Sequence, residues 1–377
     1  MKTKLIMPSK LSQGKLLPTK NQMNRQLVPA SLRIYTSMLL IVVISFFLSC
    51  DSSVDDIVDL NAESAMTLQM EKSKAMSVPG PAQLLVTGLQ GASGSTIGPG
   101  GALYVTEGAV GRISRIDPKT GNVTTFASGL PPSLIGIGGV YDVAFLGGTA
   151  YALVTLVGPD VGGSDVVGIY RIDGPNSFTI IADIGAFSIA NPPNTDFFVP
   201  TGTQYAIQTY RGAFLVTDGH HNRVLHVTRD GEITEFKTFD NIVPTGLALS
   251  GNTVYMAEAG PVPHLPEDGK VVSFGPNSPT VTSVASGAPL LVDVEFNRGR
   301  TLFALSQGVW DGVGEGSPAE PNTGSLVKVN EDGTFTLITD GLDRPTSLEF
   351  IKNTAYIVTL TGEIWTIEDV TGPPFGV

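Results

Sequence analysis

The chain has 377 residues, of which 42% are hydrophobic and 15% charged, with 44 Gly, 26 Pro and one Cys. A chain of this length can bury a large core, and a single Cys excludes both a disulfide framework and a zinc site built from cysteines. Beyond the first 50 residues, which hold seven basic and no acidic side chains, 16 basic residues face 35 acidic ones; this net charge of −19 repels phosphate backbones and argues against a nucleic-acid partner.

Residues 1–49 are predicted to be a signal peptide. A nearly continuous apolar stretch, MLLIVVISFFL at 38–48, follows the basic residues. Eleven helical residues span about 16 Å, roughly half of the hydrocarbon core of a bilayer, so the stretch is too short for a transmembrane anchor. A basic region followed by a short apolar one is typical of a secretory signal peptide, whether translation starts at Met1 or at Met23.

The only cysteine, Cys50, follows this apolar stretch directly after Ser49. The segment resembles a bacterial lipobox, in which the cysteine is lipidated and becomes the first mature residue, although Phe47 stands where that motif prefers Leu. The resemblance implies an exported chain that is lipid-anchored to the bacterial cell envelope, on the periplasmic or surface side of the outer membrane. A plain signal peptide and an unlipidated buried thiol are the alternatives. Residues 50–82 are then the lipidated Cys and a flexible acidic tether.

Residues 83–370 repeat a short motif in which an aromatic residue lies between small or apolar ones, just after a turn. The aromatics are 47, 63, 41, 48 and 53 residues apart, and they are Tyr104, Tyr151, Phe214, Tyr255, Phe303 and Tyr356. A period near 50 residues, built from short alternating strands, indicates a β-propeller with four strands per blade. Six aromatics predict six blades, an all-β fold.

The two ends of the repeat region are unequal. The sixth repeat lacks a fourth strand, because the chain ends in a short tail at 371–377, whereas the first repeat is preceded by a surplus strand at 83–87. Both 88–89 and 341–342 read Gly-Leu, the ending of a fourth strand. The N-terminal strand is therefore predicted to complete the last blade and close the ring, which protects open strand edges.

Several segments resemble the ScyD/ScyE family, a group of NHL-like propellers named from gene clusters for a cyanobacterial pigment. They are PTGLA at 244–248, VYMAE at 254–258, GSLVKV at 324–329, YDV at 141–143, ADI at 182–184 and TDGHHN at 217–222. The resemblance covers about 83–368 and implies the propeller fold. It implies no particular reaction, because the biochemical role of that family is not settled.

The long loops are all expected on one face of the propeller. Three join the second strand of a blade to the third, at 156–165, 260–269 and 308–323, and the connection 185–203 between blades 2 and 3 opens on the same side. Long loops gathered on one face favour a binding surface. The candidate contact residues in them are Phe197, His264, Trp310 and Asp311. Gly- and Pro-rich loops without a function are the alternative.

Acidic residues are expected around the pore mouth on this face. Glu107 and Glu258 end the second strands of blades 1 and 4, and Asp142 and Asp293 lie near the start of blades 2 and 5, which face each other in a six-membered ring. Asp218 and His220 are expected nearby. Clustered carboxylates share protons or hold a cation, and oxygen ligands suit Ca²⁺ or Mg²⁺. Glu107 and Glu258 are the candidate metal ligands; the alternative is that these acids cap backbone N–H groups or pair with Arg112 or Arg211.

Three functions from different classes fit these features. The first is a lipid-anchored binding module whose loop face recognises a small molecule, a glycan or a protein. The second is a divalent-metal-dependent hydrolase, lactonase or lyase with its site at the pore mouth, like other propeller enzymes. The third is a rigid platform within a surface complex. No P-loop, G-x-S-x-G or H-E-x-x-H motif occurs in the sequence to favour another chemistry.

Overall fold

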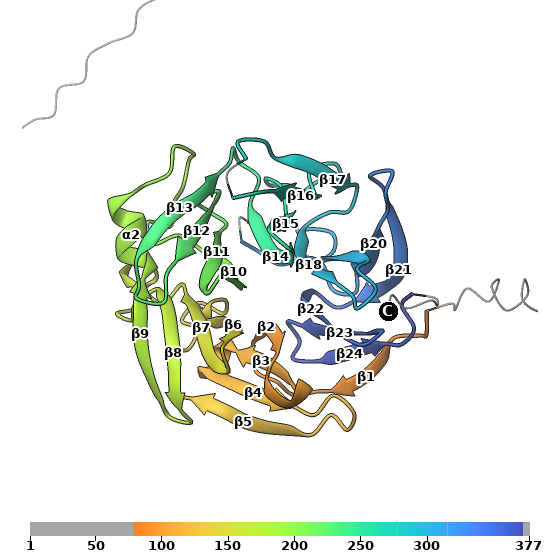
Figure 1. Ribbon diagram of the computed structural model, residues 1–377, viewed down its shortest axis with the longest axis horizontal. Coiled ribbons are helices and arrows are strands. Elements are labelled where there is room, and N and C mark those ends of the chain that lie inside the picture. The colour runs from red at the N-terminus through yellow and green to blue at the C-terminus, as the bar shows by residue number, and fades with distance from the viewer. Residues whose placement is uncertain (1–78, 277, 315, 372–377) are drawn as a thin grey trace, which may run out of the picture. The chain divides into compact units, whose positions relative to one another are not determined.

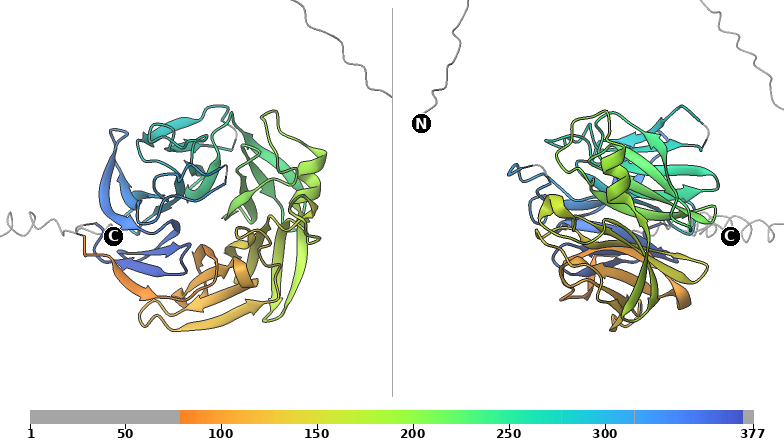
Figure 2. Two further views of the ribbon diagram at one scale, coloured as in Figure 1. Left: turned by 180° about the vertical axis from the view of Figure 1, so that it is seen from behind. Right: turned by 90° about the vertical axis from the view of Figure 1, so that its left-hand side faces the viewer.

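The computed structural model describes residues 79–276, 278–314 and 316–371; the expected signal peptide and Cys50 lie outside these residues. Within them, six four-stranded antiparallel sheets surround a central axis, so the predicted six-bladed propeller is confirmed (Figure 1). The ring is also visible from behind, and the side view shows the depth of the sheets (Figure 2). Over the described residues, no helix combines the length and the apolar character needed to cross a bilayer.

The blades follow one another in chain order, and each starts with its innermost strand. Blade 1 has β2 (Ala92–Ile97), β3 (Leu103–Glu107), β4 (Arg112–Ile116) and β5 (Val123–Ser128). Blade 2 has β6 (Gly139–Leu146), β7 (Thr149–Thr155), β8 (Gly168–Gly174) and β9 (Ser177–Asp183). Blade 3 has β10 (Gln204–Tyr210), β11 (Ala213–Asp218), β12 (Arg223–Val227) and β13 (Ile233–Thr238).

The second half of the ring repeats this pattern. Blade 4 has β14 (Pro244–Ser250), β15 (Thr253–Glu258), β16 (Lys270–Phe274) and β17 (Thr282–Ser286). Blade 5 has β18 (Leu291–Phe296), β19 (Leu302–Ser306), β20 (Gly324–Val329) and β21 (Phe335–Leu342). Blade 6 has β22 (Pro345–Ile351), β23 (Thr354–Thr359) and β24 (Ile364–Ile367), and its fourth strand is β1 (Gln83–Val86).

The ring is closed by the N-terminal strand, as the sequence predicts. β1 pairs antiparallel with β24, with Gln83 opposite Thr366 and Val86 opposite Ile364, and the two strands lie side by side in Figure 1. The backbone N–H of Leu89 also donates to the carbonyl of Gly362 at 3.0 Å. Because β1 and β24 lie at opposite ends of the described chain, their pairing ties the last blade to the first.

The hydrophobic core is divided among the junctions between blades. Strand alternation gives each sheet two apolar faces, and each face packs against the neighbouring blade. One cluster joins blades 1 and 2 through Tyr104, Ile113, Val143 and Ala152, and equivalent clusters fill the other five junctions. The aromatics of the repeat lie in these clusters, which explains why the motif recurs once per blade.

Turns and loops are distributed unequally between the two faces. The turns on one face are short, and Gly121 and Gly231 have positive φ there, as the tight hairpins require. On the other face lie the long loops 156–167, 259–269 and 307–323, together with the connection from β9 to β10. That connection contains a short helix, α2 (Ile184–Ala190), whose N-cap Asp183 accepts a hydrogen bond from the N–H of Ala186 at 2.7 Å.

Candidate functional site

A pocket of about 550 Å³ lies on the axis at the face that carries the long loops. It is lined by the start of every innermost strand and by parts of the surrounding loops. Its volume falls in the range of pockets that hold small molecules, roughly 300–1,000 Å³. This pocket is therefore the candidate site.

One side chain from each blade occupies the same place in the pocket wall. Each innermost strand has a shift of register near its start, and the residue directly after the last pair before that shift lines the pocket. These six residues are Ser93, Tyr141, Tyr205, Thr245, Val292 and Thr346. Ser93, Thr245 and Thr346 use their hydroxyls on backbone carbonyls, which leaves the two tyrosines as the distinctive polar members.

The wall formed by blades 2 and 3 carries three hydroxyl groups. The rings of Tyr141 and Tyr205 lie edge to face with centroids 6.0 Å apart, and Thr203 lines the pocket beside them. Thr203 is 4% exposed, and its Oγ1 has no hydrogen-bond partner among the described residues. Burial raises the pKa of Tyr141 and, together with the charge of Asp218, raises that of Tyr205 to about 12. Both phenols therefore stay protonated at physiological pH.

The wall formed by blades 4 and 5 carries the aliphatic lining residues, which are Val243, Ala259, Val262, Leu290 and Val292. Its polar members, Thr245, His264, Gln307 and Ser317, each have a hydrogen bond to another protein group. Val292 occupies in blade 5 the place that Tyr141 occupies in the facing blade 2. The pocket thus has a hydroxyl-bearing side and an aliphatic side.

Few ionisable groups line the pocket. Among the described lining residues, apart from the two tyrosines, they are Asp196, His220 and His264. Asp196 is exposed at the rim, and His220 packs edge to face against Phe198 with ring centroids 4.5 Å apart. Burial lowers the pKa of His264, whose Nδ1 lies 3.2 Å from the carbonyl oxygen of Ala259. No Lys, Arg or Glu is among the described lining residues.

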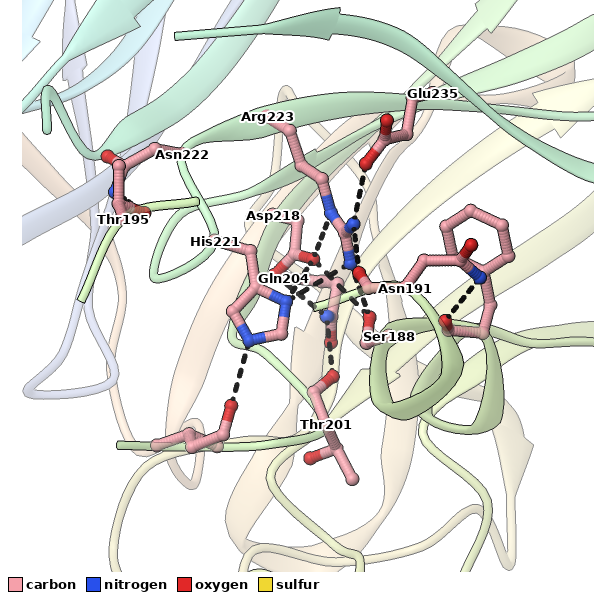
Figure 3. A network of polar contacts seen from close by, with 12 residues as sticks. Ser188, Asn191, Thr195, Thr201, Gln204, Asp218, His221, Asn222, Arg223 and Glu235 are labelled. Carbon is pink, nitrogen blue, oxygen red and sulfur yellow. Dashed lines mark hydrogen bonds and ion pairs between the residues drawn. The ribbon is translucent and has the colours of Figure 1, made fainter. Parts of the chain in front are cut away.

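A buried network centred on Arg223 holds the loop that forms one side of the pocket (Figure 3). The side chain of Arg223 is fully buried, and its Nε donates to Asp218 Oδ2 at 3.1 Å. Its Nη1 donates to Glu235 Oε1 and to the carbonyl of Asn191, each at 2.8 Å, and its Nη2 donates to Ser188 Oγ at 3.0 Å. A buried guanidinium is stable only with such a complete set of acceptors.

The same network reaches the pocket wall through His221. Arg223 Nη2 lies 3.1 Å from His221 Nδ1, and His221 Nε2 lies 3.0 Å from the carbonyl of Val199. His221 Nδ1 also lies 3.1 Å from Asp218 Oδ2, and because a carbonyl can only accept, Nε2 donates to Val199. Gln204 continues the network by donating to Asp218 Oδ1 at 3.1 Å and to the carbonyl of Thr201 at 3.0 Å. The segment that carries Asp196, Phe197, Phe198 and Thr203 is thereby fixed against blade 3.

Glu107 and Asp218, the acids at the ends of the second strands of blades 1 and 3, are engaged with arginines. Glu107 receives both Arg112 Nε at 2.8 Å and Arg112 Nη2 at 2.6 Å, with further bonds from Ser114 and the N–H of Gln90. Burial raises the pKa of Glu107, but these hydrogen bonds outweigh burial and hold it below the usual value. This is the pairing with Arg112 that the sequence left open as an alternative.

The register of blade 3 corrects one alignment made from the sequence. Counting three residues from the repeated aromatic makes Thr217 the equivalent of Glu107 and Glu258. The strand pairing shows instead that Asp218 is the equivalent, because Asp218 pairs with Gln204 as Glu107 pairs with Ala92. Phe214 precedes Asp218 by four residues, whereas Tyr104 precedes Glu107 by three. Asp218 therefore occupies the Glu107 position, and the cross-strand partners of these acids are Arg112, Arg223 and Lys270.

Asp142 and Asp293 lie on the innermost strands and fasten blades to one another. Asp142 Oδ2 accepts from the N–H of Ile207 in blade 3 at 2.8 Å, and Asp293 Oδ2 accepts from the N–H of Leu348 in blade 6 at 2.7 Å. Burial raises the pKa of Asp142 well above its usual value and that of Asp293 to about 7. Neither carboxylate lines the pocket.

The expected metal ligands do not form a cation site with their neighbours. Among the described residues, no group of three or more His, Cys, Asp or Glu side chains is arranged to hold a metal ion. Both oxygens of Glu107 are occupied by Arg112, and Glu258 faces Lys270 across the sheet. Burial raises the pKa of Glu258 to about 7. Their surroundings therefore do not fit Ca²⁺ or Mg²⁺.

The candidate loop residues divide into two groups. Phe197 and His264 line the pocket, as does His220. Trp310 and Asp311 do not: Trp310 packs edge to face against His264 with ring centroids 6.0 Å apart, and Asp311 accepts hydrogen bonds within its own loop from Ser317 and Val313. The sequence analysis missed Tyr141, Thr203 and Tyr205 as pocket residues. The signal available for the tyrosines was their shared position at the start of the innermost strand.

Solved structures of propeller enzymes resemble this fold. An aldose sugar dehydrogenase from Streptomyces coelicolor, in a PQQ-bound form, is 15% identical with a TM-score of 0.54, over 78% of this chain and 99% of that chain. XC5397 from Xanthomonas campestris, a gluconolactonase, is 13% identical with a TM-score of 0.54, over 78% and 90%. A luciferin-regenerating enzyme is 11% identical with a TM-score of 0.54, over 79% and 98%.

These likenesses establish the fold. No family model matches the sequence, and no curated protein matches it either.

Proposed function

We propose that this chain is a lipid-anchored, extracytoplasmic β-propeller that binds a small molecule in the axial pocket of its loop face. The observation that carries the proposal is the pocket of about 550 Å³, to which all six blades contribute the same strand position. The buried Thr203 hydroxyl without a partner supports it, because a polar group left unpaired in a pocket wall costs free energy that a ligand can recover. The motifs quoted from the sequence support, as part of this proposal, an assignment of the propeller to the ScyD/ScyE family.

Binding is favoured over the metal-dependent hydrolase, lactonase or lyase that the sequence offers as the alternative. That enzyme requires a set of carboxylate and imidazole ligands, whereas Glu107 is held by Arg112 and Ser114. The likeness to propeller enzymes does not decide between the two functions, because one propeller scaffold carries many activities.

A pair of adjacent substitutions tests the pocket. Ala109 and Val110 are both exposed on the same short turn of helix, but only Ala109 lines the pocket. In a thermal-shift screen of small neutral molecules and mono- and disaccharides, we expect Ala109→Trp to abolish shifts that Val110→Trp leaves intact. A ligand at 100 times its Kd stabilises by about 2.7 kcal/mol, which moves the melting temperature by several degrees. Hits that persist unchanged in Ala109→Trp would contradict binding in the pocket.

The membrane anchor has its own test. Cys50 is proposed to be acylated after removal of residues 1–49, which would hold the chain at the membrane through several acyl chains at about 0.8 kcal/mol per buried CH₂. In a bacterial host, the wild-type chain is expected in the membrane fraction with labelled fatty acid attached. Cys50→Ser is expected to lose the label and leave that fraction, while Ser52→Ala keeps both. A labelled Cys50→Ser chain would refute acylation at this residue.

A further inference from the structure

We propose that the pocket selects an uncharged amphiphile: a molecule with hydrogen-bond-accepting oxygens along one edge and an apolar body. This inference rests on the proposed function and names the ligand class of the same site. It follows from the division of the pocket into a hydroxyl-bearing wall on blades 2 and 3 and an aliphatic wall on blades 4 and 5.

The hydroxyl-bearing wall offers donors. Neither Tyr141 nor Tyr205 forms a hydrogen bond through its phenol with another described residue, and each ring is half-buried at the pocket wall. A protonated phenol donates readily, and both phenols keep their proton at physiological pH. The neighbouring hydroxyl of Thr203 is also unsatisfied. A ligand that satisfies this wall must therefore present acceptors such as a carbonyl, an ester or an ether.

The position of Tyr205 is fixed by a glycine. A Cβ atom at Gly219 would overlap the ring of Tyr205, so the ring packs directly on the backbone of residue 219. The N–H of Gly219 donates to the carbonyl of Thr203 at 2.8 Å, which joins the two hydroxyl-bearing residues to the same turn. The donors are thus held in place before a ligand arrives, and a preorganised wall loses little conformational freedom on binding.

The opposite wall selects for an apolar body. Val243, Val262, Leu290 and Val292 offer no side-chain donor or acceptor. An aliphatic or aromatic surface buried against them gains about 25 cal/mol per Å². The same contacts would desolvate the hydroxyls of a sugar without replacing their hydrogen bonds, which is unfavourable.

The charges around the pocket exclude ions. No Lys or Arg is among the described lining residues, and Asp196 lies at the rim, so an anion meets no permanent positive charge and one repelling carboxylate. A cation finds no ionised carboxylate inside either, because Asp142 and Asp293 stand outside the lining with their oxygens on backbone N–H groups. An ion entering this pocket would lose its hydration without compensation.

Two dyes of almost identical shape test the inference in the whole protein. Nile red is neutral and carries a carbonyl oxygen; Nile blue has the same ring system, with a cationic iminium nitrogen in place of that oxygen. In fluorescence titrations at pH 7, Nile red is expected to bind saturably and at least about tenfold more tightly than Nile blue. Tyr205→Phe and Tyr141→Phe should each weaken Nile red by about three- to tenfold, the effect of one lost hydrogen bond.

The matched control is Tyr210→Phe. Tyr210 is also buried with an unpartnered hydroxyl, but it lies outside the pocket lining, so its removal should leave the dye affinity unchanged. Nile blue binding as tightly as Nile red, or insensitivity to both pocket tyrosines, would overturn the ligand class while the pocket function stands. Saturable binding of neither dye, or dye binding unaffected by Ala109→Trp, would overturn the proposed function as well.

Discussion

Four carboxyl groups lie along the innermost strands. Two of them, those of Asp142 and Asp293, accept hydrogen bonds from backbone N–H groups that no partner strand pairs. Each innermost strand is paired on one edge only, so N–H groups on its other edge need acceptors. Asp142 accepts from its own neighbour Val143 and from Ile207 of the next blade, and Asp293 does the same with Val294 and Leu348. Gly94 and Gly246, at the equivalent positions of the preceding blades, leave room for these carboxylates.

Further along the innermost strands, Glu295 and Glu349 lie close enough to the aspartates for their charges to interact. Burial and the charge of Asp293 raise the pKa of Glu295 to about 8. Burial raises the pKa of Glu349 well above its usual value, and the charges of Glu295, Asp293 and Asp142 add to this. The sequence analysis named Asp142 and Asp293 but missed Glu295 and Glu349, because the register of the innermost strands, which spacing alone does not reveal, brings these acids together.

This crowding predicts that the protein loses stability as the pH rises. The folded state binds protons at these acids more tightly than the unfolded chain, so their contribution is complete below about pH 4 and is lost as the pH rises through about 8. Glu295→Gln keeps an acceptor and removes the charge. In urea unfolding, we expect it to stabilise the protein by on the order of 1–3 kcal/mol at pH 8 and much less at pH 5. Glu331→Gln, on an exposed turn, is the control; equal effects of the two variants at pH 8 would contradict the repulsion.

At the scale of elements, the sequence predicted those features of the fold that depend on residues close together in the chain. The strands, the short glycine turns and the face that carries the long loops all follow from alternation and from Gly positions near the strand ends. The helix α2 was not predicted, because seven residues give too little periodicity to distinguish a helix from a loop. Its place depends on Arg223, which lies 32 and 35 residues further along the chain and donates to the carbonyl of Asn191 and to Ser188 Oγ.

The pocket was predicted only in part, because, like the place of α2, it depends on contacts between residues distant in the sequence. The sequence placed His220, His264 and Phe197 on the correct face, and all three line the pocket. It made Glu107 a candidate metal ligand with Asp218 nearby and left pairing with an arginine open as the alternative; each of the two acids lies beside an arginine at the start of the next strand. A signal was present, because Arg112 and Arg223 each follow their acid by five residues across a tight loop. Choosing between a metal and an arginine for such an acid requires the cross-strand register, which the shifted aromatic of blade 3 obscured.

At the scale of the whole molecule, the ring depends on contacts between the two ends of the described chain. Strand β1 buries Val86 against Ile364 and Val358 of blade 6 and against Leu103 of blade 1. Since these contacts form after almost the whole chain is in place, closing the ring carries a large entropic cost that local strand pairing does not. The stability of every blade therefore depends on one four-residue strand.

Substitutions at two residues of β1 test, in the full chain, whether the stability of the ring depends on this strand. Val86 is 6% exposed and faces the junction between blades 6 and 1, whereas Leu84 is 47% exposed on the outer side of the same strand. Val86→Asp places an unpaired charge in the junction and should cost at least about 3 kcal/mol, because the strand must detach or carry the charge into the core. Leu84→Asp should cost less than about 1 kcal/mol. Urea unfolding with size-exclusion chromatography measures both; detachment would also expose the edge of β24 and promote association. Similar costs for the two variants would show that β1 does not hold the ring closed.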